Sequence, residues 1–293
     1  MSVYEIITDR IVSLLKAGTV PWRKPWAAGS AAPRSLVSGK PYRGINVFLL
    51  QNLGFPSPYF LTFKQALQRG GSVRKGEKGC PVVFWKWVDA SELRDEEDEA
   101  QPTQGRVSLL RFFTVFNSSQ CDGIQVPEGV AIATAFAPLE ACERVVAGMQ
   151  RPPAIEHGYS SAFYVPSLDV VRLPKPEAFR TPQDYYATLF HEIGHASGHP
   201  SRLARKEITD ARMFGDHAYS REELCAEMTA AFLCGHTGID TTTLDSSASY
   251  IASWLDKLQH DHRLVVTAAA QAQRAADFIL GAAGALATEQ EAA

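Results

Sequence analysis

His191-Glu192-Ile193-Gly194-His195 is the stretch that decides the fold of the second half of this 293-residue chain. On an α-helix, residues four positions apart share one face, so His191 and His195 can bind the same metal ion. Glu192 then lies beside the metal, where it can take a proton from metal-bound water. The spacing therefore predicts a helix that carries two metal ligands and a catalytic general base.

The flanking residues favour this helix over two unrelated surface histidines. Thr181 is a good N-cap, Pro182 suits the first helical position, and Gly198 followed by Pro200 can end the helix. From its composition alone, a chain like this would contain such a motif by chance about one time in a hundred. The motif is thus predicted to bind a metal.

The third metal ligand has to come from another part of the chain, because catalytic zinc uses three protein ligands. A third histidine six residues after His195 is one known arrangement, but Ser201 occupies that position, and His199 falls two residues short. The segment 221–227 offers glutamates instead. Glu223 and Glu227 lie four apart, so we expect Glu223 to bind the metal and Glu227 to accept a hydrogen bond from a ligating histidine.

An alternative role for Glu223 remains open at this point. Ser220 and Glu223 also form the S-x-x-E pattern of a capping box, in which Glu223 would only cap its own helix. Glu227 and then Glu222 are the next candidates for the ligand. Two histidines and one glutamate favour a single divalent ion, zinc by ligand type, with manganese as the alternative.

Two further features near the motif suggest a substrate surface. The segment 164–171 resembles an edge strand, which could pair with a bound peptide or simply form part of a sheet. Tyr219 and His217 precede the predicted ligand helix, and either could stabilise an oxyanion. Both features fit a peptidase site.

The net charge of −3 hides a strong asymmetry along the chain. Residues 1–90 contain 13 Lys and Arg against 4 Asp and Glu, whereas the remaining 203 residues contain 16 against 28. Four of the five tryptophans also lie in the first 90 residues. A basic, tryptophan-rich segment indicates a polyanionic partner.

Single-stranded DNA is the partner that this composition favours. Aromatic rings stack on unpaired bases while cations follow the phosphates, and the sequence shows no convincing helix-turn-helix for duplex recognition. The competing interpretation is that the aromatic residues are core and the charges a solvated face. The predicted DNA-binding residues are Trp22, Arg23, Lys24, Trp26, Tyr42, Arg43, Asn46, Tyr59, Phe60, Lys64, Arg74, Lys75 and Lys78.

Local patterns predict an α+β protein with two domains. Helices are expected over 2–17 and 62–70, a pair of strands over 82–88 and 109–116, and a further strand over 162–171. We expect a small α+β single-stranded-DNA-binding domain over 1–125, with an acidic insertion near 91–106. A boundary region over 126–155 then leads to a mainly helical, zincin-like metallopeptidase domain with a small sheet over 156–293.

Cysteines and hydropathy predict a cytoplasmic protein. The five cysteines are scattered and odd in number, which favours reduced thiols. The first residues have no apolar signal core, and no apolar run is long enough to cross a membrane, so we expect no membrane partner. The oligomeric state and any protein substrate stay open.

Several motifs taken together resemble the ArdC-type antirestriction proteins. They are the repeated Pro-Trp at 21–22 and 25–26, Tyr-Arg-Gly-Ile-Asn at 42–46, Leu-Thr-Phe-Lys-Gln-Ala at 61–66, Gly-Gly-Ser-Val-Arg-Lys-Gly-Glu at 70–77, and the second-half motifs from Tyr164 through the histidine motif to Glu227. The N-terminal motifs also resemble plasmid primases of the TraC type. The E-x-x-A-E pattern of 223–227 resembles the E-x-x-A-D ligand helix of some zincins. Phe60 occupies a position where we would expect Trp in an ArdC-type protein.

The resemblance implies a function that composition and spacing do not show. It implies an antirestriction protein, carried on a conjugative plasmid, that binds single-stranded DNA and has a metal-dependent, peptidase-like domain. Incoming plasmid DNA would thereby be protected from host restriction. The alternatives are an active intracellular zinc metalloprotease recruited to DNA, and a DNA-coating protein whose metal site is only structural.

Overall fold

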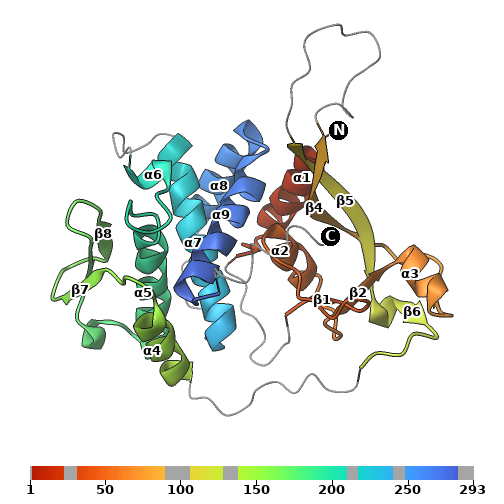
Figure 1. The fold of residues 1–293 in the computed structure, drawn as a ribbon, viewed down its shortest axis with the longest axis horizontal. Helices are drawn as coiled ribbons and strands as arrows, with labels where there is room; N and C mark the ends of the chain where they lie inside the picture. Colours follow the sequence, from red (N-terminus) through yellow and green to blue (C-terminus); the bar gives the residue numbers. More distant parts are fainter. Residues whose placement is uncertain are drawn as a thin grey trace, which may run out of the picture.

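Small β-sheets lie on either side of a central group of helices, which confirms the expected α+β class (Figure 1). The structure is a computed structural model that describes residues 2–22, 32–89, 106–127, 138–209, 217–239 and 248–282. Residues 91–105 of the predicted acidic insertion and residues 128–137 of the predicted boundary region therefore lie outside the described residues.

The N-terminal half combines three helices with a four-stranded sheet of order β1-β2-β5-β4 and a short β3-β6 pair. Its elements are α1 (Val3–Lys16), β1 (Arg34–Ser35), α2 (Ile45–Gln51), β2 (Tyr59–Thr62), α3 (Phe63–Gln68), β3 (Ser72–Val73), β4 (Cys80–Asp89), β5 (Arg106–Asn117) and β6 (Cys121–Asp122). The predicted helices over 2–17 and 62–70 both form. Ser2 and Thr62 cap them through capping boxes, because each hydroxyl accepts from the backbone of the third helical residue.

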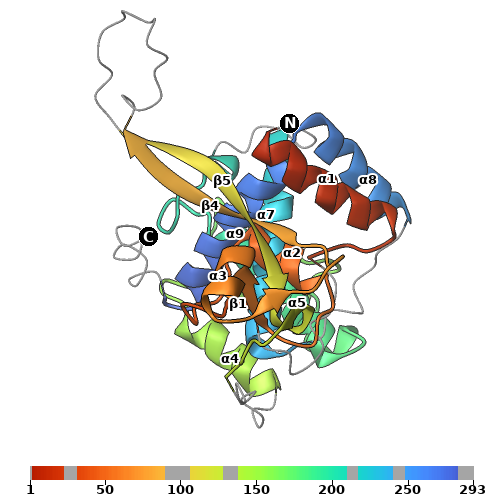
Figure 2. The ribbon, with the colours of Figure 1, turned by 90° about the vertical axis from the view of Figure 1, so that its right-hand side faces the viewer.

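The strands β4 and β5 form the predicted pair, which is antiparallel and longer than the sequence pattern indicated. Their register runs from Cys80 opposite Val115 to Asp89 opposite Arg106. The strand β2 pairs with β5 only over residues 115–117, so most of the hairpin is two strands wide. Figure 2 shows this hairpin extending outward, away from the helices.

The C-terminal half is mainly helical and contains one three-stranded sheet of order β7-β9-β8. Its elements are α4 (Pro138–Gly148), β7 (Ala154–His157), β8 (Phe163–Val165), β9 (Val170–Leu173), α5 (Pro182–Ala196), α6 (Lys206–Thr209), α7 (His217–Thr237), α8 (Ala248–His260) and α9 (Leu264–Ile279). The prediction of one strand over 162–171 was wrong. A turn at 166–169 divides the segment, and Asp169 takes a positive φ of 50° there.

One of three hydrophobic clusters in the described residues joins the two halves of the chain. Ile7, Ile11 and Phe48 from the N-terminal helices pack in one buried cluster with Met228 of α7 and Val265 of α9. Figure 1 shows α7, α8 and α9 between the C-terminal sheet and the N-terminal elements. The core therefore continues across the predicted boundary region.

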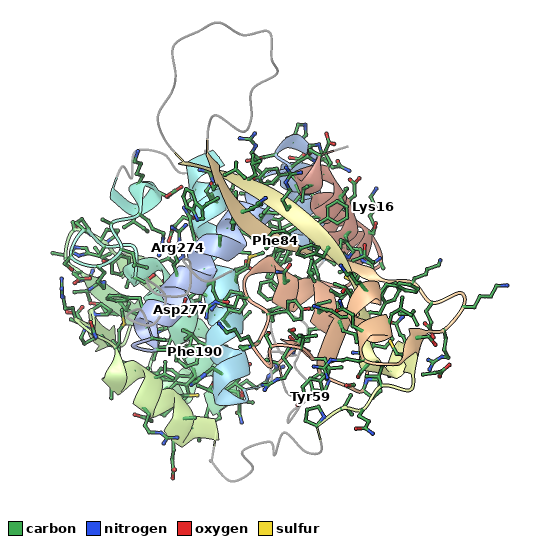
Figure 3. All side chains as sticks on the ribbon, turned by 45° about the vertical axis from the view of Figure 1, so that its right-hand side comes forward. Lys16, Tyr59, Phe84, Phe190, Arg274 and Asp277 are labelled. Carbon is green, nitrogen blue, oxygen red and sulfur yellow. The ribbon has the colours of Figure 1, made fainter. Side chains whose placement is uncertain are left out.

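Polar contacts reinforce this junction on α9. Arg43, which precedes α2, forms an ion pair with the buried carboxylate of Asp277, and the backbone N–H of Gly44 donates to the Gln273 side chain at 3.0 Å. Figure 3 shows Asp277 on α9, between the two halves. The Arg43 guanidinium is thus committed in part to holding the halves together.

Candidate metal centre and nucleic-acid interface

The helix α5 forms where the sequence predicts and presents both motif histidines toward α7. The backbone N–H of Asp184 donates to the Thr181 hydroxyl at 3.1 Å, and Pro182 occupies the first turn. Phe190 and Ile193 are fully buried beneath the helix. Burial of this apolar face leaves the histidines on the adjoining face.

Gly194, the fourth residue of the motif, allows α5 and α7 to approach closely. A Cβ atom at Gly194 would lie 3.2 Å from both the Cα and the carbonyl oxygen of Ala226, and 3.3 Å from the Cβ of Thr229. Any side chain here would push the two helices apart. The glycine therefore helps to bring the glutamates of α7 within reach of the histidines.

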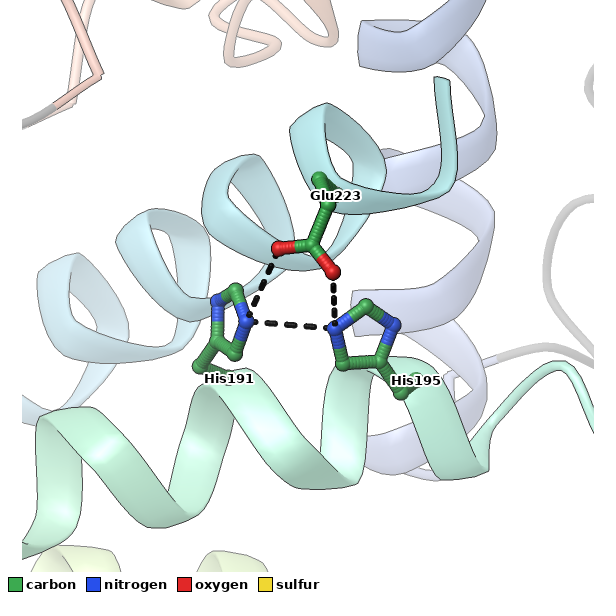
Figure 4. Close-up of side chains that lie close together, drawn as sticks. All are labelled: His191, His195 and Glu223. Atoms are coloured by element: carbon green, nitrogen blue, oxygen red, sulfur yellow. Dashed lines mark hydrogen bonds and ion pairs between the residues drawn. The ribbon is translucent and has the colours of Figure 1, made fainter. Parts of the chain in front are cut away.

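The metal-ligating side chains predicted from sequence, His191, His195 and Glu223, converge in the structure (Figure 4). The two imidazole Nε2 atoms lie 3.1 Å apart. The Glu223 carboxylate oxygens lie 3.6 Å from the His191 Nε2 and 3.5 Å from the His195 Nε2. Among the described residues, these three are the group that could hold a metal.

The geometry of this cluster fits a divalent ion. Ligands bound about 2.1 Å from a tetrahedral metal lie roughly 3.4 Å from one another. The three separations fall close to that value, and all three ligand atoms lie within 4.8 Å of one another. Nitrogen and oxygen donors of this kind suit zinc and also manganese.

Glu222 supports His195 from behind the cluster. Its carboxylate lies 3.2 Å from the His195 Nδ1. The guanidinium of Arg205 donates to both Glu222 oxygens, at 2.9 Å and 2.5 Å. Burial alone would raise the pKa of Glu222, but hydrogen bonds from His195 and Arg205 lower it. The charged Glu222 therefore orients the His195 ring so that Nε2 faces the cluster.

Glu227 was predicted to accept a hydrogen bond from a ligating histidine, and this prediction needs correction. The carboxylate that accepts from His195 is that of Glu222. Glu227 accepts instead from the indole N–H of Trp22 at 2.8 Å and from the hydroxyl of Tyr250. Both carboxylates lie on α7, but the way α7 crosses α5 turns Glu222 toward His195. Glu227 faces the N-terminal half.

Glu192, the predicted general base, is 6% exposed and lies between the metal cluster and the strand β8. Burial raises the pKa of Glu192, whereas the neighbouring His191 and His195 and a backbone hydrogen bond from Tyr164 act to lower it. The net effect is an elevated pKa, which suits a carboxylate that accepts and returns a proton.

Tyr219 lies at the mouth of the cluster, where it is 41% exposed. Burial and the adjacent Glu223 charge raise the pKa of Tyr219, whose hydroxyl hydrogen-bonds to the Glu223 carboxylate. A protonated phenol can donate to an oxyanion, in keeping with the predicted role. The side chain of His217 lies outside what the structure describes.

The strand β8 is the edge of its sheet, as expected for a peptide-binding strand. The turn after it is anchored by Arg202, which donates to the Asp169 carboxylate and to the carbonyl oxygen of Ala196 at the end of α5. Asp169 also accepts from the Tyr164 hydroxyl at 2.8 Å. These bonds fix the edge strand relative to the metal helix.

Four of the predicted DNA-binding side chains are buried, and their prediction as contact residues needs correction. Trp22 is 2% exposed, Tyr59 6%, Phe60 2% and Asn46 9%. The aromatic residues fill the core, while the Asn46 amide pairs with the backbone N–H and carbonyl of Val83, each at 2.7 Å. None of them offers a ring face or an edge to a base.

The remaining predicted DNA-binding residues differ in their availability. Burial raises the pKa of Tyr42, packed against the core, to about 12. Arg74 is exposed but is bound to Glu77, to Asp122 and to a backbone carbonyl. The side chains of Lys64, Lys75 and Lys78 are exposed. Arg23, Lys24 and Trp26 lie outside the described residues.

A set of exposed aromatic side chains on the hairpin β4–β5 is absent from the residues predicted to bind DNA. Trp85 is 44% exposed, Trp87 45%, Phe112 43% and Phe113 54%. The pattern Phe-Trp-Lys-Trp at 84–87 was available as a signal, because alternation along a strand puts Trp85 and Trp87 on one face. Only the tertiary structure shows that this face is uncovered.

The fold and the site define a protein with an ArdC-type N-terminal domain and a zincin-like metallopeptidase domain. Residues 1–116 match the profile of the N-terminal domain of anti-restriction factor ArdC, and residues 140–271 that of a zincin-like metallopeptidase. No described helix is long and apolar enough to cross a membrane.

Solved structures and curated relatives place the chain in a family. The metal-free crystal structure of the antirestriction protein ArdC from plasmid R388 has a TM-score of 0.74 and 36% identity, covering 97% of this chain and 99% of that one. The Mn(II)-bound structure of the same ArdC protein has a TM-score of 0.74 and 35% identity, covering 98% of this chain and 100% of that one. The chain belongs to the ArdC family of antirestriction proteins.

The curated relatives differ in length. The protein y4eC of Sinorhizobium fredii is 37% identical over 287 residues, which cover 94% of this chain and 91% of that protein. A DNA primase TraC of Escherichia coli is also 37% identical, over 292 residues that cover 94% of this chain. This chain spans only 27% of that primase, so it corresponds to one part of the longer protein.

Proposed function

We propose that this protein is an antirestriction factor that binds single-stranded DNA with its N-terminal half and carries a zinc-dependent peptidase site in its C-terminal half. The observation that carries the enzymatic part is the convergence of His191, His195 and Glu223 beside the buried Glu192. Manganese is the alternative ion, in keeping with the Mn(II)-bound ArdC structure from plasmid R388.

In a peptidase reaction the chain supplies the proton transfers and the positioning. Bound by His191, His195 and Glu223, the metal would supply a Lewis acid for the scissile carbonyl. Glu192 takes the proton of the attacking water and passes it to the leaving amine, for which its raised pKa is suited. Tyr219 donates a hydrogen bond to the oxyanion. The edge strand β8 pairs with the peptide backbone and holds it extended.

Single-stranded DNA binding is supported by the charge of the N-terminal half. Residues 1–90 carry an excess of nine basic over acidic side chains, and Lys64, Lys75 and Lys78 are exposed there. The similar proteins include one named an antirestriction protein and others named DNA primases, and these names support the same partner. We place the activity in the cytoplasm, in keeping with five free thiols.

The variant Glu192→Gln tests the peptidase part, because it removes the base and leaves the ligands in place. The measurement is cleavage of an unfolded protein such as reduced casein by the zinc-loaded chain, with and without single-stranded DNA. We expect Glu192→Gln to abolish cleavage while zinc content and DNA affinity stay unchanged. If wild-type protein binds zinc but does not cleave the casein substrate, the proposed peptidase activity is contradicted.

Transfer of an unmodified plasmid into a restricting host tests the antirestriction part. We expect wild-type protein to raise the number of transformants or transconjugants, and no increase would contradict the function. The same assay with Glu192→Gln separates the alternatives. Full protection by the variant would favour a DNA-coating protein whose metal site is structural, whereas loss of protection would favour a protease recruited to DNA.

A further inference from the structure

The outer part of the hairpin β4–β5 is a two-stranded ribbon with exposed aromatic side chains. In the described part of the chain, residues 106–114 of β5 pair only with β4. The ribbon is held at its base, where Val82 and Val83 enter the core and Asn46 binds the Val83 backbone. Figure 2 shows the ribbon continuing well past α2, the helix that carries Asn46.

The register places three of the exposed rings on one side of the ribbon. Side chains alternate along a strand, so Trp85 and Trp87 share a face, about 6.8 Å apart along the strand. Phe112 lies opposite Val83, which puts its ring on this same face and diagonal to Trp85. We call Trp85, Trp87 and Phe112 the tryptophan face.

The opposite side of the ribbon carries the positive charge. Arg111 lies opposite Phe84 in the register, and Lys86 lies two residues after Phe84 on β4, so both point to the same side. Both charged side chains are exposed. Phe84 stacks on Phe113 there, with ring centroids 4.4 Å apart and an angle of 4° between the planes. Both cations therefore project from the side of the ribbon that faces away from Trp85 and Trp87.

This combination of rings and cations identifies the chemistry of a partner. Contiguous exposed apolar surface on a soluble protein marks an interaction site, and three large rings on one face form such a surface. A purely apolar partner would not account for the exposed Arg111 and Lys86 on the same ribbon, nor for the excess of nine basic side chains over residues 1–90. A polyanion with flat apolar groups satisfies both features.

We propose that the tryptophan face is the platform on which single-stranded DNA stacks its bases, while the basic side chains of this half of the chain attract its phosphates. This inference rests on the proposed DNA-binding function and deepens it, because it assigns the binding surface. Unpaired bases offer their faces to Trp85 and Trp87, whereas bases in a duplex are already stacked on one another. The platform therefore selects single strands and tolerates any sequence.

The double variant Trp85→Ala/Trp87→Ala tests the platform in the full-length protein. The measurement is fluorescence anisotropy of an end-labelled oligo(dT) of about 20 nucleotides, since a single OB fold covers about 4–16 nucleotides. Removing two stacking rings should weaken binding by about tenfold or more. The pair Trp85→Phe/Trp87→Phe keeps flat rings and should restore most of the affinity.

Phe63→Ala is the matched control, because Phe63 on α3 is 51% exposed in the same half of the chain but lies off the ribbon. We expect it to bind oligo(dT) like the wild-type protein. Thermal unfolding of all variants checks that the exposed tryptophans contribute little to stability. Quenching of tryptophan fluorescence by oligo(dT) should be smaller in the double variant than in Phe63→Ala.

The outcomes separate this assignment from the function on which it rests. Wild-type protein without affinity for oligo(dT) overturns the proposed DNA binding and the platform together. Wild-type binding that is unchanged in Trp85→Ala/Trp87→Ala overturns the platform alone. Equal affinity for a duplex of the same length overturns base stacking. A change in oligomeric mass by light scattering, without a change in DNA affinity, identifies the face as a contact between copies of the chain and also overturns the platform.

Discussion

The indole N–H of Trp22 donates to the carboxylate of Glu227 at 2.8 Å. This hydrogen bond joins the N-terminal half to α7, one turn beyond Glu223, the proposed metal ligand. Trp22 also packs edge-on against Trp254 of α8, with ring centroids 6.0 Å apart. The two residues were predicted to serve different sites, and the structure uses them together at the junction.

Substitution of Trp22 should therefore affect stability before it affects DNA binding. Trp22→Ala removes a ring that is 2% exposed and should lower the free energy of unfolding by about 3–5 kcal/mol. Trp22→Phe keeps most of the ring but loses the donor to Glu227, for a loss of about 1–2 kcal/mol. Urea unfolding measures both. A Trp22→Ala protein of wild-type stability that has lost only DNA binding would contradict the structure.

Glu223 and Glu227 should differ sharply in their effect on the metal. Glu223→Ala removes one of the three donors and should reduce bound zinc after dialysis to a small fraction of the wild-type content. Glu227→Gln is the matched control on the same helix, because its side chain faces Trp22 and Tyr250. Metal analysis by mass spectrometry measures both. Full zinc retention in Glu223→Ala would remove Glu223 from the ligand set.

Loss of Glu222 should cost both stability and metal affinity. Glu222→Ala leaves the guanidinium of Arg205, which is 7% exposed, without its carboxylate partner, at a cost of about 3–5 kcal/mol. The same change frees the His195 ring and should weaken zinc binding about 10–100-fold. Glu222→Gln keeps an acceptor for His195 and should weaken binding less. Calorimetric zinc titration that finds wild-type affinity in Glu222→Ala would exclude this supporting role.

The pairing of Asp169 with Arg202 should give stability that depends on pH. Burial acts to raise the pKa of Asp169, but hydrogen bonds from Arg202 and Tyr164 lower it overall. A lowered pKa means that ionised Asp169 stabilises the fold above its unfolded pKa of about 3.9, and that this contribution is lost as the pH falls through the folded value. Asp169→Asn should cost about 3 kcal/mol near neutral pH, because the Arg202 side chain is buried.

Urea unfolding at several pH values measures the effect of Asp169→Asn. The difference from wild-type protein should shrink below about pH 3.9. Glu156→Gln serves as the control, since Glu156 forms an exposed ion pair with Arg172, and it should leave stability nearly unchanged. A difference between Asp169→Asn and wild type that is constant with pH would contradict the ion pair.

The shared core predicts that residues 1–127 do not fold alone. Ile7 and Ile11 of α1 pack in the same cluster as Leu258 of α8 and Val265 of α9, so the fragment would expose apolar surface that is fully buried in the whole chain. We expect weak, non-cooperative unfolding of the fragment by circular dichroism, against one cooperative transition for the whole chain. Cooperative unfolding of the fragment would make residues 1–125 an independent domain.

Local patterns predicted the elements whose causes are local. Ser2, Thr62 and Thr181 each cap the helix that follows them, because a hydroxyl at that position reaches the backbone of its own first turn. The same locality explains why His191 and His195 could be paired from their spacing. The strand predicted over 162–171 failed because the pattern did not show the turn at Asp169.

Roles that depend on packing between helices could not be assigned from spacing. Glu223 and Glu227 share one face of α7, yet Glu222 is the residue that reaches His195. The angle at which α7 crosses α5, set in part by Gly194, decides which carboxylate meets which ring. Side chains on one helix have fixed relative positions, but the position of a second helix depends on the whole core.

The sequence by itself determined the spacing of the proposed metal ligands and general base, the basic character of the N-terminal half and the resemblance to the family. These properties reside in residue types and in spacing along one element, which the backbone geometry of a helix or strand converts directly into position. Only the tertiary structure decided that Trp22 is core while Trp85 and Trp87 are exposed. Burial depends on which distant segments of the chain cover a side chain. The identity of a residue as tryptophan is the same whether that residue is buried or exposed.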